Sequence, residues 1–152
     1  MHLSSTAFQE GTSIPKHCTG DGKDLSPPLL WSGAPATVKS FALICDDPDA
    51  PRKEPWVHWV IYDLPASIHD LGEGVPAIEE LPGGGRQGKN DFNKIGYGGP
   101  APPPGKPHRY YFKLYALDTM LNLPAGARKH ELETAMKGHI AAQGQIMGKY
   151  GR

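Results

Sequence analysis

Carboxylates and imidazoles carry most of the chemical capacity of this chain, and they stand at the ends of its most apolar segments. Asp47 and Asp49 follow the apolar run 41–45, whereas His58 and His108 lie at or near the start of two later apolar runs. A carboxylate that accepts a hydrogen bond from an imidazole stabilises the imidazolium, whose other N–H edge can then face an anion. We therefore expect Asp47 or Asp49 to pair with His58 or His108, although an isolated pair of this kind more often holds strand ends together than binds a ligand.

Prolines fix the direction in which the acidic side chains point. Residues 46–55 read Asp-Asp-Pro-Asp-Ala-Pro-Arg-Lys-Glu-Pro. A residue that precedes proline avoids the helical region of backbone space, so Asp47, Ala50 and Glu54 are expected to be extended within one stiff turn. This turn should hold its carboxylates beside the segment that carries His58.

Three segments have the composition of β-strands and must position these groups. Residues 38–45 have apolar side chains in both alternating sets, which predicts a strand covered on both faces. Residues 56–63 and 108–117 are rich in aromatic and β-branched residues and predict two further strands. Side chains alternate between the two faces of a strand. In the strand 56–63, one face is expected to carry Trp56, His58 and Val60, and the other Val57, Trp59 and Ile61. In the last strand, the residues that share a face are His108, Tyr110, Phe112 and Leu114.

The remaining segments are predicted to be rich in loops. Residues 1–24 suggest short edge strands. Residues 26–33 predict a strand entered through two prolines, which suits a sheet edge or the start of a strand better than a sheet centre. Residues 65–107 show no sustained period, which is typical of functional loops or of disordered segments.

Residues 128–147 are predicted to be helical, because Leu132, Met136 and Ile140 recur at four-residue spacing. Several strands with so few helices predict a mainly β fold. We expect an antiparallel β-sandwich with one or two peripheral helices, including this C-terminal helix.

Composition bounds the class of protein. With 152 residues, the chain is expected to be one domain, 1–152, with a sizeable core. Its 16 basic and 16 acidic residues balance without a basic run, which argues against nucleic-acid partners and anionic membrane surfaces. Since no signal segment or transmembrane-length apolar run is present, we expect a cytoplasmic protein. Cys18 and Cys45 lack CxxC spacing and are expected to be reduced thiols.

Three other chemistries have partial support. His58, His108 and one aspartate have the ligand types of a two-histidine, one-carboxylate metal site, but no close-spaced ligand motif accompanies them. A hydrolase would need a nucleophile, and Cys45 lies inside an apolar strand, where a thiol is usually inert. Residues 83–90 nearly match a phosphate-binding P-loop but end in Asn90 and lack the flanking strand and helix. We therefore predict no catalytic residue, no metal site and no cofactor. The other histidines are expected to lie at the surface or to have their hydrogen bonds satisfied within the protein rather than to act as ligands, namely His2, His17, His69, His130 and His139.

Two sequence blocks occur in combination. Residues 47–51 read Asp-Pro-Asp-Ala-Pro with Trp-x-His-Trp at 56–59, and a Gly-Pro pair at 99–100 leads to His-Arg-Tyr at 108–110. This combination resembles the phosphatidylethanolamine-binding protein family, also called the Raf kinase inhibitor protein family. The run 89–105, which contains Lys-Asn-Asp-Phe and Gly-Tyr-Gly-Gly-Pro, is similar to the bacterial and archaeal branch.

The resemblance implies a β-sandwich with a small anion pocket at one end of the sheet. The ligand-binding residues that it implies are Asp47, Asp49, His58, Gly99, His108 and Tyr110. We expect the backbone N–H near Gly99 and the Tyr110 hydroxyl to donate hydrogen bonds beside the imidazolium. The resemblance also implies a cis peptide bond near 49–51 and a homodimer.

The function that the resemblance implies is non-enzymatic binding of phosphate, carboxylate or phosphoryl head groups, as a signalling regulator. The alternative is a protein-interaction module that inhibits a kinase or protease through the proline-rich loop 99–107.

Overall fold

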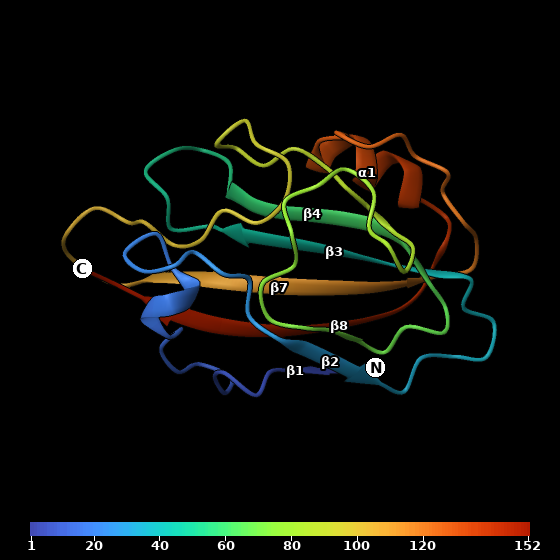
Figure 1. Cartoon of the computed structure of the whole chain (residues 1–152), viewed down its shortest axis with the longest axis horizontal. Helices are drawn as coiled ribbons and strands as arrows, with labels where there is room; N and C mark the ends of the chain where they lie inside the picture. Colours follow the sequence, from blue (N-terminus) through green and yellow to red (C-terminus); the bar gives the residue numbers. More distant parts are fainter.

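The strands of the protein form two antiparallel sheets, as the computed structural model of residues 1–152 shows (Figure 1). The elements in chain order are β1 (His2–Ser4), the 3-10 helix η1 (Lys16–Cys18), β2 (Leu29–Ser32), β3 (Ser40–Asp47), β4 (Trp56–Pro65), β5 (Asp70–Leu71), β6 (Arg86–Gln87), β7 (His108–Leu117), α1 (Lys129–Met136) and β8 (Ile140–Tyr150). The larger sheet has the order β6-β4-β3-β7-β8, and the smaller has the order β1-β2-β5. The predicted mainly β, antiparallel fold is confirmed.

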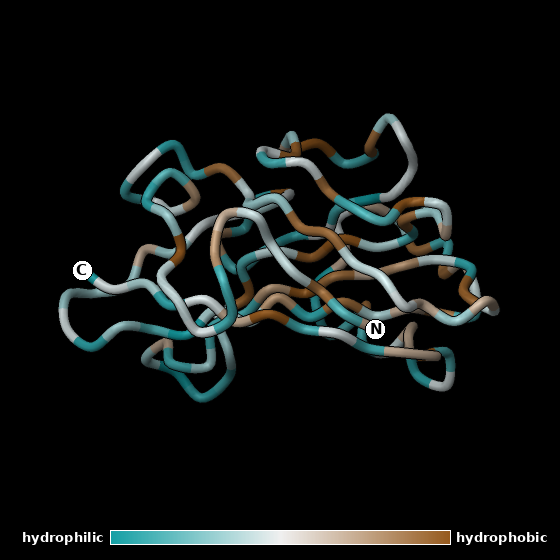
Figure 2. Tube along the Cα trace, turned by 90° about the horizontal axis from the view of Figure 1, so that it is seen from below, coloured by the Kyte–Doolittle hydropathy of each residue, from teal (hydrophilic) through white to brown (hydrophobic).

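Strand β3 lies at the centre of the core. All of its residues are buried, which confirms the prediction of a strand covered on both faces. One face of the larger sheet packs against the smaller sheet, where Trp31 meets Phe41 at a ring-centroid distance of 5.4 Å. The other face packs against Leu132 and Met136 of α1. Hydrophobic residues accordingly follow the strands along the molecule, while the loops at its ends are mostly hydrophilic (Figure 2).

A β-bulge at His58 changes the predicted faces of β4. Cys45 pairs with Trp59 and Asp46 pairs with Val57, so His58 has no partner in β3. The extra residue puts Val57 on the face that α1 covers, whereas Trp59 packs between the two sheets. The regular alternation predicted over 56–61 is therefore wrong, because a period of two does not allow for an inserted residue.

The helix predicted over 128–147 is correct only in its first half. α1 ends at Met136, and the chain then forms β8, which pairs with β7 along its length as an edge strand. Gly138 has a φ of +80°, which favours glycine and ends the helix. Gly148 lets β8 approach the N-terminal segment closely, since a Cβ there would lie 2.6 Å from Cγ1 of Ile14. The expected C-terminal helix is thus an internal helix followed by a strand.

The loop-rich segments agree with expectation except at β2. After β4 ends at Pro65, the residues up to 107 contain only the two-residue strands β5 and β6. Residues 1–24 contain β1 and η1. β2 begins directly after its two prolines, so the prediction of prolines at a strand start is confirmed. The alternative of an edge strand is wrong, since β2 lies between β1 and β5 in the smaller sheet. α1 has eight residues, and no helix has the length and apolar character to span a bilayer.

Three loops meet at the end of the sandwich where the C-terminus lies (Figure 1). They are 15–25, 48–55 and 97–107, which in Figure 1 are blue, teal and gold. The backbone N–H of Gly20 donates to the carbonyl of Pro100 at 2.8 Å, which joins the first loop to the last. β3 ends and both β4 and β7 begin at this end, so the residues predicted to do chemistry converge here.

Candidate functional site

A small pocket of about 200 Å³ lies at this end, between the loops 48–55 and 97–107 and the adjoining ends of β3, β4 and β7. Its polar lining residues are Asp47, His58, His108 and Tyr110, and its apolar lining residues are Ala50, Pro51, Trp56, Phe92, Ala101, Pro102 and Pro103. The two histidine rings both contact the Tyr110 ring, with centroid distances of 5.1 Å for His58 and 6.5 Å for His108. The structure therefore brings together four of the six residues that the sequence indicated.

Asp47 and His108 form a largely buried pair. Oδ2 of Asp47 lies 2.6 Å from Nδ1 of His108, and their side chains are 4% and 12% exposed. Oδ1 of Asp47 accepts the backbone N–H of Asp49 at 2.8 Å, which fixes the orientation of the carboxylate at the start of the turn. Because Nδ1 faces the carboxylate, Nε2 is the ring nitrogen of His108 that remains without a protein partner.

His58 plays a different part from the one predicted. Its Nδ1 lies 2.5 Å from the carbonyl of Gly98, whose N–H in turn donates to the His58 carbonyl at 2.9 Å. Burial lowers the pKa of His58, against the opposing effects of the Gly98 carbonyl and the Asp47 charge. Burial therefore favours the neutral ring, in which Nδ1 donates to Gly98 and Nε2 is an acceptor.

Tyr110 supplies a protonated hydroxyl. The residue is 1% exposed, and burial, with the nearby Asp47 charge, raises the pKa of its phenol far above the usual range. No protein group hydrogen-bonds to this hydroxyl. It is consequently free to donate to a molecule in the pocket.

Asp49 lies outside the pocket lining and holds Arg109 instead. Its carboxylate accepts from Nε and Nη2 of Arg109 at 2.9 Å each, and from the Arg109 backbone N–H at 2.9 Å. The guanidinium lowers the pKa of Asp49 to about 2. Asp49 therefore anchors the turn to the start of β7, and the expectation that it lines the pocket is not met.

Gly99 also lies outside the lining. Its N–H donates to Oδ1 of Asp24 at 2.7 Å, so it is not free for a ligand as we had expected. The glycine is required for a different reason, because a Cβ at this position would clash with the Asp24 carboxylate and with the Cys18 carbonyl. Asp24 was not singled out from the sequence, since its role depends on a contact between distant loops.

The turn at 48–51 contains no cis peptide bond, and every peptide bond of the chain is trans. The expected cis bond is therefore absent, and trans is the generally favoured form before proline. Local hydrogen bonds close the turn, from the Asp49 N–H to the Asp47 side chain and from the Arg52 N–H to the Ala50 carbonyl at 2.7 Å.

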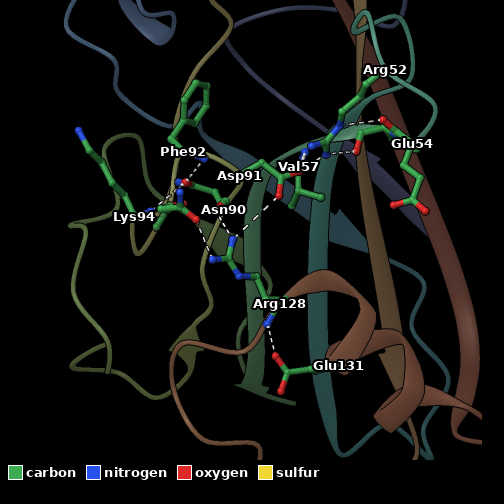
Figure 3. A network of polar contacts seen from close by, with 12 residues as sticks. Arg52, Glu54, Val57, Asn90, Asp91, Phe92, Lys94, Arg128 and Glu131 are labelled. Atoms are coloured by element: carbon green, nitrogen blue, oxygen red, sulfur yellow. Dashed lines mark hydrogen bonds and ion pairs between the residues drawn. The ribbon is translucent and has the colours of Figure 1, made fainter.

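A polar network supports the apolar wall of the pocket (Figure 3). Asp91 accepts hydrogen bonds from Arg52 and from the Val57 backbone, and the Arg52 guanidinium lies 4.5 Å from the centre of the Trp56 ring. Oδ1 of Asn90 accepts the backbone N–H of Phe92 at 2.9 Å. Trp56 and Phe92 then pack edge to face at 5.4 Å.

The same network ties α1 to the pocket. Nη1 of Arg128 donates to the Asn90 carbonyl at 3.0 Å, and its Nη2 donates to Oδ1 of Asn93 at 2.7 Å. Arg128 precedes α1, and its own N–H donates to Oε1 of Glu131 at 2.9 Å, which caps the helix. The roles of Trp56 and Phe92 as walls were missed from sequence, because such packing is tertiary. The only available signal was that both residues fall inside the blocks that resemble the family.

The sequence matches the family described as phosphatidylethanolamine-binding protein over residues 4–151. Similar chains include a protein named UPF0098 from Methanothermobacter thermautotrophicus, which is 49% identical over all of this chain and 99% of that protein. Another UPF0098 protein, from Aquifex aeolicus, is 47% identical over all of this chain and 89% of that protein.

Two crystal structures have the same fold. A phosphatidylethanolamine-binding protein homologue from Chlamydia trachomatis matches with a TM-score of 0.91 and 41% identity, covering 99% of this chain and 97% of that one. YbcL of Escherichia coli, described as a member of the mammalian PEBP family, matches with a TM-score of 0.92 and 32% identity, covering 99% and 98% of the two chains. The chain therefore belongs to the phosphatidylethanolamine-binding protein family.

Proposed function

We propose that the protein binds a small oxyanion, namely a phosphate, a carboxylate or a phosphoryl head group, in the pocket at the end of the sandwich. The observation that carries this proposal is the buried pair of Asp47 and His108 beside the unpartnered Tyr110 hydroxyl. Asp47 offsets the charge of a protonated His108 from behind, through Nδ1. The opposite edge of the ring, Nε2, can then donate to an anion.

The apolar wall suggests the form of the ligand. Seven of the eleven lining residues are alanine, proline, tryptophan or phenylalanine, so the pocket also buries apolar surface. An oxyanion attached to a small apolar body would contact His108 and Tyr110 with its charged end and Trp56 and Phe92 with its body. With two donors at about 1 to 3 kcal/mol each and some buried apolar surface, less the cost of association, we expect affinities in the millimolar range.

The composition of the pocket favours binding over catalysis. Its lining contains no serine, threonine, cysteine or lysine that could act as a nucleophile. Cys45 is near in sequence but fully buried in β3, and burial raises the pKa of its thiol well above the usual value, which suppresses the reactive thiolate. We therefore assign the protein a non-enzymatic role, as a regulator that responds to its ligand.

A protein-interaction role is the second candidate, and the loop 99–107 favours it. Pro103, Pro104 and Pro107 are exposed while Pro102 is buried in the pocket wall. The exposed prolines therefore present a rigid surface directly beside the ligand site. If this surface binds a kinase or protease, replacing Pro103 and Pro104 by alanine will abolish recovery of that partner in a pull-down, and undiminished recovery will remove the loop from the proposal.

An NMR titration tests the binding proposal. Inorganic phosphate and, separately, acetate are added at about pH 6 while the imidazole resonances of all histidines are followed. We expect the largest shift at His108 and a smaller one at His58, with His2 and His130 as exposed controls. Saturable shifts confined to the controls, with His108 and His58 unmoved, would reject the proposal.

A further inference from the structure

We propose that His17, Cys18 and Glu73 form a binding site for a divalent cation that favours thiolate ligands, such as Zn²⁺. The three ligand atoms all lie within 4.8 Å of one another. This site is separate from the pocket, shares no residue with it, and does not depend on the proposed anion binding. No sequence motif indicated it, because Glu73 lies far along the chain from the other two residues.

His17 and Glu73 form a partly exposed pair, and the thiol of Cys18 lies buried beside them. Nε2 of His17 lies 2.6 Å from Oε1 of Glu73, and these side chains are 46% and 41% exposed. Cys18 has no exposed surface. A cation could therefore reach the imidazole and the carboxylate from solvent and take the thiol as its inner ligand.

Backbone hydrogen bonds hold the two ligand-bearing segments together. The N–H of Leu25 donates to the His17 carbonyl at 3.0 Å, which closes the loop around η1. The N–H of Gly74 donates to the Ser26 carbonyl at 2.9 Å, and that of Val75 donates to Oγ of Ser26 at 2.9 Å. Glu73 is thus fixed next to His17 before any cation binds, which lowers the ordering cost of binding.

The donor set suits zinc. Thiolate, imidazole and carboxylate are its usual ligands, at roughly 2.3, 2.0 and 2.1 Å, and three protein ligands leave one position for water. Ligand atoms around such an ion are roughly 3.5 Å apart, so the histidine and glutamate would separate slightly and the thiol would move inwards.

Binding requires the loss of the thiol proton. Burial, with a smaller effect of the Glu73 charge, raises the pKa of Cys18 to about 11, so the thiol is protonated near neutral pH. The cation forms a bond to Sγ and the S–H proton leaves to solvent. The proton on Nε2 of His17, which faces Glu73, leaves to solvent as well or moves to Nδ1, so that Nε2 and the carboxylate can both bind the cation. At least one proton is therefore released for each cation bound.

A bound cation would brace the loops beside the pocket. The carbonyl of Cys18 accepts the hydroxyl of Tyr97 at 2.7 Å, and Gly20 donates to Pro100. Fixing Cys18 from the outside therefore restrains the segment 97–100. We expect Zn²⁺ to raise the melting temperature of the whole chain.

Cobalt titration of the intact protein tests the site, because Co²⁺ bound to a thiolate gives a charge-transfer absorption in the near ultraviolet. We expect this band, and a proton release, in the native protein and in Cys45→Ser. The Cys45 thiol that this variant removes is as buried as that of Cys18, but it lies in no cluster of possible metal ligands. Cys18→Ser should lose the band. His17→Asn and Glu73→Gln, both at exposed positions that the fold tolerates, should each weaken binding of Co²⁺ and Zn²⁺ at least tenfold.

Three results would overturn the proposal. They are the absence of the band in the native protein, its survival in Cys18→Ser, and unchanged affinity in both His17→Asn and Glu73→Gln. In each case His17 and Glu73 form an ion pair only. The histidine and glutamate variants also keep the test decisive if Cys18→Ser fails to fold.

Discussion

Replacing Asp47 by asparagine separates the charge of this residue from its shape. The amide oxygen of the new side chain could still accept the Asp49 N–H, so the turn that follows β3 should keep its conformation. What changes is the group that faces Nδ1 of His108, where a neutral amide replaces a carboxylate at 2.6 Å. In the proposed complex, a protonated His108 ring would lose its counter-charge.

The size of the effect follows from the burial of the pair. With side-chain exposures of 4% and 12%, the interaction is little screened by solvent, and a hydrogen bond to a charged group contributes about 1.5 to 3 kcal/mol. If the anion binds through the protonated form of His108, most of this amount is lost from its binding free energy. Since about 1.4 kcal/mol corresponds to a tenfold change, phosphate affinity should fall about 10- to 150-fold.

Isothermal titration calorimetry or NMR titration with inorganic phosphate at about pH 6 measures the loss. Asp49→Asn is the matched control, since it makes the same chemical change two residues away at a carboxylate that faces Arg109 and lies outside the pocket lining. We expect its phosphate affinity to stay within about threefold of the native value. Equal losses in the two variants, or native affinity in Asp47→Asn, would refute the assignment of Asp47 as the partner of a protonated His108.

Three further predictions concern stability. Gly99→Ala should lower the free energy of unfolding by about 1 to 3 kcal/mol in urea, because the new Cβ would clash with the carboxylate of Asp24. Asp46→Asn should cost about 1 to 3 kcal/mol in the same assay, since its buried carboxylate accepts from two lysines. Arg109→Gln should flatten the loss of stability between about pH 4 and pH 2. The folded-state pKa of Asp49 is about 2 against 3.8 ordinarily, so its stabilising effect is present above pH 4 and disappears as pH falls through 2.

Matched variants control these measurements. Gly83→Ala adds the same methyl group where no atom lies within 4 Å, and Asp118→Asn removes a carboxylate whose side chain is 49% exposed. Both should change the free energy of unfolding by less than about 0.5 kcal/mol. If either control matches its test variant, the buried contact does not explain the loss. If Arg109→Gln loses as much stability as the native protein between about pH 4 and pH 2, Asp49 contributes nothing to the acid sensitivity of the fold.

The sequence predicted the strands well where composition alone decides them. β3 and β7 have apolar patterns that only a sheet accommodates, and both were placed correctly. β8 was mistaken for the continuation of a helix, because residues 128–147 contain apolar positions at four-residue spacing. What decides its strand conformation is the pairing with β7, along with glycines that face the N-terminal segment. Pairing between distant segments leaves no periodic signal within β8 itself.

The sequence predicted those residues of the site that lie at the ends of strands. Asp47 and His108 sit at the end and the start of adjacent antiparallel strands, so their meeting follows from the fold. The partners of Asp49 and Gly99 did not follow, because Arg109 and Asp24 are chosen by loop geometry that local sequence does not fix. Both aspartates of the turn are candidates for one role by sequence, and the contacts of the folded protein separate them.

The bulge at His58 decides which face of the larger sheet this side chain lies on. Asp46 pairs with Val57 and points to the face covered by α1, where it meets lysines. Asp47, one residue later, points to the pocket face. In a regular ladder His58 would pair with Asp46 and would share its face, away from the pocket. The inserted residue breaks this rule, so that the imidazole lies against Tyr110, beside the pair formed by Asp47. The pocket thus depends on one extra residue in β4, which places a second imidazole where strict alternation would have placed none.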